Sequence, residues 1–327
     1  MAYNKKIILI GTGGTIAGQA TSETDLTGYQ SGVLTLQDIL GSVPGVSQFG
    51  PFEYNQFANI ESSDITTQQW IELSNVVQNY VDCDDVEGVV ITHGTDSMEE
   101  TAYLLHLTVH TNKPIVITGS MRPSSTISAD GPINLLQAMQ VVRTPESVGK
   151  GVLITLNGYI DSAREVTKMN TTNVATFGSP NLGHIGIIQD GVAHFYGIST
   201  RRHTMDSEFS CKDMKRLPQV EILYCYAGIE DIIGLALLAT SPEGLILVGL
   251  GHGTIPKTIR KVTERLEIPV VRSSRTGSGI VSVVPTDHRS QYLVSDSLNP
   301  AKARILLALG LSKGMNKDEL AQLFKVY

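Results

Sequence analysis

Short apolar runs alternate with longer stretches of helically spaced apolar residues over roughly the first two hundred positions. The apolar runs are typical of buried strands and lie at 7–10, 88–92, 114–119 and 151–156. The longer stretches are typical of helices and lie at 66–80, 98–110 and 131–142. This alternation predicts an α/β fold in which a parallel sheet carries helices on both faces.

A looser, polar stretch at 197–217 separates this series from a second one. In the second series, strands are predicted at 221–225, 244–249 and 269–272, and helices at 301–309 and 317–326. The chain of 327 residues also exceeds the size of about 250 to 300 residues at which a single core usually stops growing. We therefore expect an N-terminal catalytic α/β domain at 1–196, a linker at 197–217 and a smaller C-terminal α/β domain at 218–327.

Charge and hydropathy limit the kinds of molecule that the protein can bind and the compartments in which it can work. The chain has 25 Lys and Arg against 32 Asp and Glu, a net charge of −7 without a basic block, which disfavours nucleic acid and anionic membranes as partners. No apolar run approaches the roughly 18 residues of a membrane span, and the run after Lys6 is shorter than the apolar region of about 7 to 15 residues in a signal peptide. We expect a cytoplasmic protein as written, or a periplasmic one if a leader has been removed.

Cysteine and histidine spacing gives no sign of a metal site. Cys83, Cys211 and Cys225 lack CxxC spacing, which argues against both a disulfide framework and a zinc site. His106 and His110 have helical ligand spacing, but leucine follows His106 where a zinc protease has glutamate. We expect a structural role for this pair, and no metal or cofactor.

Two turns rich in glycine and hydroxyl groups follow predicted strands, at 11–18 and at 92–101. Ligands bind at the carboxyl ends of strands in open α/β sheets, so the pair marks a candidate site. The first turn is not a nucleotide cradle, because Ile16 replaces the last glycine of GxGxxG and Gln19 replaces the P-loop lysine. A plain tight turn remains the alternative. His93, in the second turn, is expected to serve turn packing.

The candidate chemistry is that of an activated hydroxyl. A threonine hydroxyl is a weak nucleophile and needs a base or electrostatic activation. Thr95 and Asp96 provide a hydroxyl and a carboxylate side by side, and Lys168 provides an amine. The residues alone leave open whether Lys168 is a base or an ion-pair partner.

Five motifs occur in order along nearly the whole chain, at 12–18, 92–101, 128–135, 272–275 and 297–304. Together they resemble the bacterial L-asparaginase family, particularly its type II branch of asparaginases and glutaminase-asparaginases. The resemblance implies a larger N-terminal and a smaller C-terminal α/β domain. It also implies a homotetramer built from two intimate dimers, with active sites at the dimer contacts and a small amino acid as substrate.

The same resemblance assigns the catalytic residues. It implies that Thr15 attacks the side-chain amide carbon of asparagine, releases ammonia and forms an acyl-enzyme that water hydrolyses to aspartate. Tyr29 matches the tyrosine of the mobile loop that closes over the substrate. Thr95, Asp96 and Lys168 match a second constellation that activates a nucleophile or relays a proton. Which threonine attacks first stays open.

Substrate contacts follow from the resemblance as well, together with three departures from the family pattern. Ser62 matches the serine that holds the α-carboxylate, and Asp96 also pairs with the α-ammonium group. Ser63 replaces the usual Gln or Glu, and Thr254 stands where many members have Asn or Ser that reaches the neighbouring subunit's site.

A glutamate that many members use to grip the ammonium group has no counterpart at 280–285, where Asp287 is the nearest stand-in. We expect this protein to bind amino acids more weakly than the tightest-binding family members do, and to prefer asparagine over glutamine. Cys83 matches half of a disulfide in some members, but Asn112 stands where its partner is expected, so that bond cannot form.

Two other functions remain to be tested against this one. A non-catalytic amino-acid sensor would need no nucleophile, which disfavours it. An amidohydrolase subunit of a tRNA-linked amidotransferase is disfavoured by the net charge of −7.

Overall fold

The computed structural model describes residues 3–264 and 266–327. Two compact units divide the chain, Met1–Met214 and Lys215–Tyr327. Met1 and Ala2, with which the expected first domain begins, lie outside the described residues. The segment expected as a linker, 197–217, lies mostly within the first unit, where Ser207 Oγ donates a hydrogen bond to Leu107 O. Buried contacts of this kind hold the segment against the first unit.

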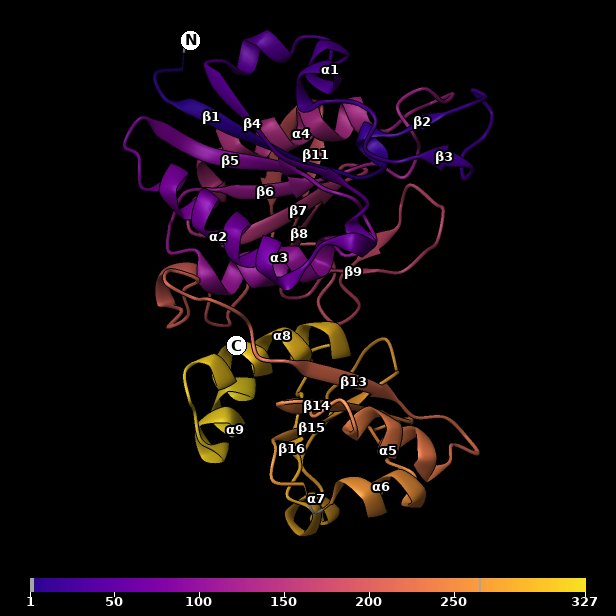
Figure 1. The fold of residues 1–327 in the computed structure, drawn as a ribbon. Coiled ribbons are helices and arrows are strands. Elements are labelled where there is room, and N and C mark those ends of the chain that lie inside the picture. Colours follow the sequence, from indigo (N-terminus) through magenta and orange to yellow (C-terminus); the bar gives the residue numbers. More distant parts are fainter. Residues whose placement is uncertain (1–2, 265) are drawn as a thin grey trace. The chain divides into compact units, whose positions relative to one another are not determined.

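The first unit is built on an eight-stranded sheet in the order β12-β11-β8-β7-β6-β5-β1-β4 (Figure 1). Its strands are β1 (Lys6–Gly13), β4 (Phe52–Ile60), β5 (Val86–Thr92), β6 (Ile115–Thr118), β7 (Val152–Leu156), β8 (Tyr159–Ser162), β11 (Gly186–Gln189) and β12 (Val192–Phe195). Strands β4, β1, β5, β6 and β7 run parallel, and β8, β11 and β12 add antiparallel pairings. The expected fold class is confirmed, with an antiparallel edge that the sequence analysis did not include.

Two tight hairpins produce that edge. Asn157 and Gly158 connect β7 to β8 with φ values of 53° and 77°, and Asp190 and Gly191 connect β11 to β12 with φ values of 52° and 80°. Left-handed conformations at both central residues are the signature of the type I′ turn, which Asn-Gly and Asp-Gly favour.

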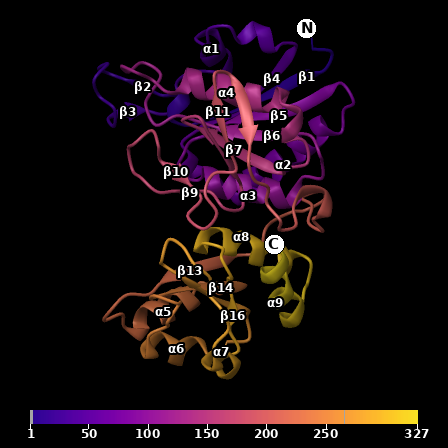
Figure 2. The same ribbon diagram turned by 180° about the vertical axis from the view of Figure 1, so that it is seen from behind.

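Helices cover both faces of this sheet (Figures 1 and 2). They are α1 (Leu36–Gly41) and α4 (Gly131–Arg143) on one face, and α2 (Thr67–Val81) and α3 (Met98–Thr108) on the other. Within β1, Ile7 and Leu9 belong to the first core cluster, whereas Ile8 and Ile10 belong to the second. Because successive side chains of a strand point to opposite faces, the strand must be apolar throughout.

Shorter elements of the first unit carry several site residues. They are β2 (Gln19–Ala20), β3 (Tyr29–Gln30), β9 (Thr167–Lys168), β10 (Phe177–Gly178) and the 3₁₀ helices η1 (Thr15–Ala17), η2 (Val46–Phe49), η3 (Ser62–Asp64), η4 (Pro145–Ser147) and η5 (Thr204–Asp206). Strands β2 and β3 form an antiparallel ribbon, and β9 and β10 form another.

The second unit contains a four-stranded parallel sheet in the order β13-β14-β15-β16. Its strands are β13 (Val220–Tyr224), β14 (Gly244–Gly249), β15 (Val270–Ser274) and β16 (Leu293–Val294). Its helices are α5 (Asp231–Leu238), α6 (Lys257–Thr263), α7 (Pro285–Ser290), α8 (Pro300–Ser312) and α9 (Lys317–Val326). The expected strands β13 to β15 and the closing helices α8 and α9 are all present.

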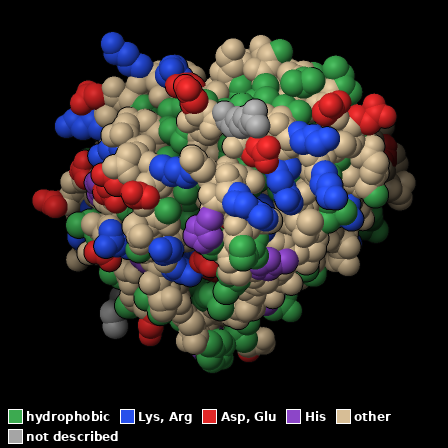
Figure 3. All heavy atoms as spheres, turned by 90° about the horizontal axis from the view of Figure 1, so that it is seen from below, with side chains coloured by type: hydrophobic (Ala, Val, Ile, Leu, Met, Phe, Trp, Pro, Cys, Tyr) green, Lys and Arg blue, Asp and Glu red, His purple; other side chains and the backbone are tan. Residues whose placement is uncertain are grey.

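Charged side chains of both signs are interspersed on the face shown in Figure 3. Of the helices in the described part of the chain, none is long and apolar enough to cross a membrane.

Candidate active site

The two hydroxyl-rich turns meet because their strands are neighbours. Strand β1 pairs in parallel with β5, and Gly11 lies opposite Thr92. Beyond the strands, the turns touch backbone to backbone: a Cβ atom on Gly14 would lie 2.3 Å from the Cα atom of Gly94. Gly14 also has a φ of 81°, which favours glycine. The close approach brings Thr15 and Thr95 to one edge of the sheet.

Thr15 and Tyr29 form the first half of the site. Thr15 is buried and begins η1, and its Oγ1 lies 2.6 Å from the phenol oxygen of Tyr29 in β3. The phenol can therefore exchange a proton with the threonine hydroxyl directly.

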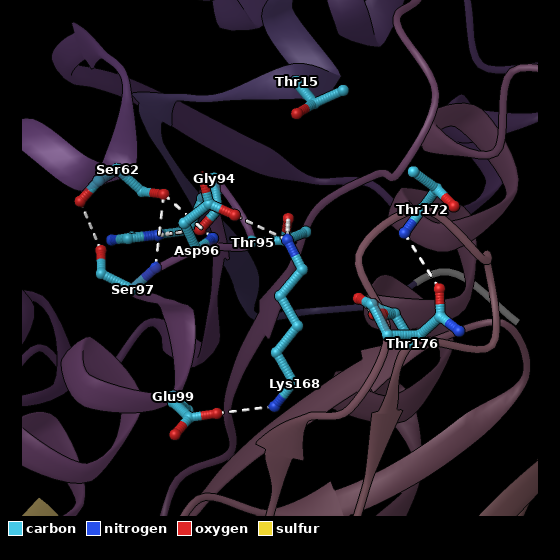
Figure 4. Close-up of polar contacts among 12 residues, drawn as sticks. Thr15, Ser62, Gly94, Thr95, Asp96, Ser97, Glu99, Lys168, Thr172 and Thr176 are labelled. Carbon is cyan, nitrogen blue, oxygen red and sulfur yellow. Dashed lines mark hydrogen bonds and ion pairs between the residues drawn. The ribbon is translucent and has the colours of Figure 1, made fainter. Parts of the chain in front are cut away.

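Thr95, Asp96 and Lys168 form the second half (Figure 4). The Lys168 Nζ atom donates to Thr95 Oγ1 at 2.8 Å and to Asp96 Oδ1 at 2.6 Å. The side chain of Asp96 is 71% exposed and that of Lys168 only 19%. The carboxylate is thus accessible to a cationic ligand, while the amine is held against the buried threonine hydroxyl.

Ser62 lies beneath this second turn. Its Oγ accepts hydrogen bonds from the backbone N–H of Asp96 at 3.1 Å and of Ser97 at 3.4 Å. The Ser97 hydroxyl donates in return to Ser62 O at 2.5 Å. The Ser62 hydroxyl accepts in both contacts, so its proton stays available for a carboxylate. Ser63, the next residue of η3, is exposed.

A cavity of about 430 Å³ joins the two halves. It is lined by the five expected catalytic residues Thr15, Tyr29, Thr95, Asp96 and Lys168. Eight further residues complete its wall: Leu26, Thr27, Met121, Arg122, Thr171, Thr172, Asn173 and Val174. Ser62 and Ser63 are absent from this lining among the described residues. The structure therefore brings the catalytic set together, and Ser62 adjoins it through the backbone of Asp96.

Two residues that line the cavity have backbone N–H groups without an acceptor among the described residues. In the described part of the chain, no hydrogen bond is made by the backbone N–H of Thr15 or of Thr95, although both residues are buried. Unpaired N–H groups in such a position can stabilise a negative charge that develops on a carbonyl oxygen.

Two acidic residues without an expected chemical role support the site. The Glu99 carboxylate accepts from the backbone N–H of Lys168 at 2.6 Å. The Asp130 carboxylate accepts from the backbone N–H groups of Met121 and of Arg122, which border the cavity. The Glu99 contact joins residues far apart in sequence, and the Asp130 contacts span a loop and follow no helical or strand spacing. The acidic residue in the first turn of α3 was the one available signal for Glu99.

Thr254 and Asp287 belong to the second unit. Thr254 is exposed and forms an isolated bridge with Leu250. Asp287 is buried, and its carboxylate binds Arg272 Nε and Nη2, each at 2.7 Å, and the backbone N–H of Val284 at 2.8 Å. Since its oxygens are engaged, Asp287 is not the free carboxylate that would replace the missing glutamate, and that expectation is corrected.

Of the two histidines with helical spacing, His106 lies in α3, whereas His110 follows the end of that helix at Thr108. His106 is buried, and its Nδ1 accepts from the backbone N–H of Val152 at 3.0 Å. Across residues 3–264 and 266–327, no group of three or more His, Cys, Asp and Glu could hold a metal ion. The three cysteines are free.

Comparison with known proteins agrees with this arrangement. Residues 6–200 match the family model "Asparaginase, N-terminal", and residues 219–324 match "Glutaminase/Asparaginase C-terminal domain". The chain is 40% identical to an L-asparaginase 2 of Bacillus subtilis (strain 168), across 98% of this chain and 86% of that protein. It is 36% identical to a glutaminase-asparaginase of Pseudomonas fluorescens biotype A, across 98% and 90%.

A crystal structure of a probable cytoplasmic L-asparaginase from Campylobacter jejuni superimposes with a TM-score of 0.96 at 38% identity. The superposition covers 99% of this chain and 100% of the Campylobacter chain. Both halves of the chain and its whole fold thus match one group of amidohydrolases. The chain belongs to the asparaginase family.

Proposed function

We propose that this chain hydrolyses L-asparagine to L-aspartate and ammonia, with Thr15 as the nucleophile. The single observation that carries the proposal is the meeting of two hydroxyl groups, each with its own proton partner, at one cavity: Thr15 with Tyr29, and Thr95 with Lys168. Hydrolysis of an amide through an acyl-enzyme needs such a nucleophile and a group that moves its proton.

Atoms balance over two steps. Thr15 Oγ1 forms an ester with the side-chain carbonyl carbon, the carbon–nitrogen bond breaks, and the hydroxyl proton leaves with the nitrogen as ammonia. Tyr29 contacts Thr15 Oγ1 and is the first station for that proton. Water then attacks the ester: its oxygen enters the new carboxyl group of aspartate, and one of its protons restores the Thr15 hydroxyl. Thr95, activated by Lys168, faces the same cavity and positions the water.

Charge supports an amino acid as substrate. The exposed Asp96 carboxylate suits the α-ammonium group, and the Ser62 hydroxyl is available to the α-carboxylate at the border of the cavity. An unpaired buried charge would cost several kcal/mol, so a zwitterion needs partners of both kinds. Ser63 and Thr254 remain proposed contacts.

Asparagine is the proposed preferred substrate, and glutamine the poorer one. Glutamine places its reacting carbon farther from the α-anchors, and a misplacement of about 1 Å can cost on the order of a hundredfold in rate. Equal specificity constants for the two amides would contradict this preference. That test is needed because a relative is a glutaminase-asparaginase.

Ammonia release by the wild type, Thr15→Ala and Thr15→Ser tests the central assignment. The alanine variant is expected to lose about 10⁴-fold or more in kcat, as when one member of a catalytic unit is removed. The serine variant keeps a hydroxyl and is expected to retain part of the activity. No ammonia from the wild type would favour a sensor, and a small loss in Thr15→Ala would point to another nucleophile.

A homo-oligomer, the tetramer of the family resemblance, is proposed as the assembly. Helix α5 supports it, because Ile232, Ile233 and Leu235 are all exposed on one short helix. Several exposed large apolar side chains on one element are typical of an interface. Light scattering on the purified protein would measure the mass, and a monomer would contradict the proposal.

The cytoplasm is the proposed compartment, supported by the likeness to a probable cytoplasmic L-asparaginase and by three free cysteines. One relative is described as a probable periplasmic L-asparaginase. Cell fractionation distinguishes the two compartments.

A further inference from the structure

A chain of buried hydrogen bonds runs beneath the second turn and ends at its backbone. Trp70 Nε1 in α2 donates to Thr101 Oγ1 in α3 at 2.9 Å, and Thr101 Oγ1 lies 3.0 Å from His93 Nε2. His93 Nδ1 lies 2.8 Å from the carbonyl oxygen of Gly94. All three side chains are buried, and the chain connects two helices to the turn that carries Thr95. We call this set the His93 relay.

The chemistry of the end groups determines the direction of each bond. A carbonyl oxygen only accepts, so His93 Nδ1 must carry the proton that it donates to Gly94 O. Burial lowers the pKa of His93 to about 4, so the ring is neutral at pH 7 and its Nε2 is an acceptor. The Thr101 hydroxyl therefore donates to Nε2 and accepts from Trp70. Each donor of the relay thus has an acceptor within it, and the imidazole of His93 is the tautomer that carries its proton on Nδ1.

The relay fixes a peptide group of the active site. In a planar trans peptide the carbonyl and the following N–H point in opposite directions. Holding Gly94 O on the His93 side therefore directs the Thr95 N–H away from His93. That N–H belongs to a residue that lines the cavity, and in the described chain it has no acceptor.

We propose that His93 is a positioning residue for amide hydrolysis: with Thr101 and Trp70, it holds the Gly94–Thr95 peptide so that the Thr95 N–H points at the oxyanion of the substrate. This inference rests on the proposed function of the site. It goes beyond the turn-packing role expected from the sequence, because a packing residue would affect stability and leave the rate constant of the folded enzyme unchanged.

Thr101 provides the mildest test, since its substitution leaves His93 in place. Thr101→Val removes the hydroxyl at nearly constant volume, and Thr101→Ser keeps it. We expect kcat to fall about 10- to 100-fold in the valine variant with KM within about threefold, because misplacing an oxyanion donor costs less than removing it, which costs about 10²- to 10³-fold. The serine variant should stay within about threefold of the wild type in both constants.

His93 itself provides a rescue experiment. His93→Leu removes both ring nitrogens, whereas the amide nitrogen of His93→Asn can replace Nδ1 as a donor to Gly94 O. We expect a loss of kcat in the leucine variant and substantial recovery in the asparagine variant. Trp70 is the only tryptophan of the sequence, so its fluorescence reports directly on the relay and on folding in each variant.

Three outcomes are decisive. In the first, folded Thr101→Val and His93→Leu keep the kcat of the wild type while Thr15→Ala is inactive. This result would overturn the relay and leave the proposed function intact. Full activity of Thr15→Ala would instead overturn the proposed function. If the relay variants fail to fold, ¹⁵N NMR of the wild-type histidines decides: a neutral Nδ1–H tautomer at His93 supports the relay, and an Nε2–H tautomer overturns it.

Discussion

The two turns of the site are held in different ways. The Thr15 turn depends on close backbone approach, and among the described residues its reactive hydroxyl forms a hydrogen bond only with the phenol of Tyr29. Tyr29 lies on a two-stranded ribbon that is partly exposed.

The Thr95 turn is anchored by buried side chains. Ser62 binds two of its backbone N–H groups, His93 binds its carbonyl, and Lys168 binds Thr95 itself. This difference indicates that the Thr95 turn is preorganised for catalysis, whereas the Thr15 turn is completed only when Tyr29 closes over it. Preorganised donors contribute to catalysis because they need no rearrangement during the reaction.

After Thr15→Ala, the largest loss of kcat is expected from removing the Lys168 cation of the second turn. Lys168→Met takes away the donor to Thr95 and Asp96, and we expect kcat to fall by about 10³-fold, within the range of 10² to 10⁴ for a group that transfers a proton. Steady-state ammonia release measures it, with the exposed Lys212→Met as control. A loss below tenfold would show that the second turn is not the preorganised half.

Acid should weaken the second turn through His93. The pKa of His93 is lowered from 6.5 to about 4, so between these values the unfolded chain binds a proton that the folded chain does not. Stability from this group is therefore complete above pH 6.5 and is lost as pH falls toward 4, by about 1.4 kcal/mol per pH unit. Denaturant unfolding gives the free energy of unfolding at each pH. Between pH 4 and 6.5, its slope against pH should differ between the wild type and His93→Asn by the equivalent of one bound proton. Parallel pH profiles would contradict the burial of a neutral imidazole.

Forcing the turns apart should disturb both halves together. Gly14→Ala places a Cβ atom against Gly94, and we expect about a hundredfold loss of kcat from misplacement of the two threonines. Gly183→Ala is a matched control, because Gly183 has a φ of 76° with no atom within 4 Å of the added Cβ. Equal effects of the two substitutions would attribute the loss to backbone strain alone.

Releasing the backbone of Lys168 should have the smallest effect. Glu99→Ala removes the acceptor of its N–H, and we expect about a tenfold loss of kcat, the equivalent of one ordinary hydrogen bond of about 1.4 kcal/mol. Glu99→Gln keeps an acceptor oxygen and should lose less. If Glu99→Gln were as slow as Glu99→Ala, the loss of kcat would come from the lost negative charge and not from the lost hydrogen bond.

The sequence predicts best the elements that are buried on both sides. Strands β1 and β5 and helix α4 are continuous or periodic in apolar residues, because each contacts a core cluster. Strand β4 was missed because this edge strand has no fully buried residue and mixes polar with apolar positions. The hairpins at Asn157–Gly158 and Asp190–Gly191 carried a usable turn signal that was not applied.

Site residues also differ in how well the sequence reveals them. Thr15 and Thr95 could be selected because family motifs contain them, and Lys168 because the family resemblance matches it to the same constellation. Glu99 binds a backbone N–H group far away in sequence and Asp130 binds two across a loop, and no regular spacing encodes either contact. Asp287 was misjudged because an acidic residue in a sequence does not disclose that Arg272 already binds it.

The central claim is that Thr15 carries the acyl group while the Thr95 turn stays in place. Mass spectrometry of peptides from Lys168→Met, quenched in acid during turnover of asparagine, tests it most directly, because slow hydrolysis should allow the ester to accumulate. The account predicts an aspartyl group on the peptide that contains Thr15. An aspartyl group on the peptide that contains Thr95 would contradict it.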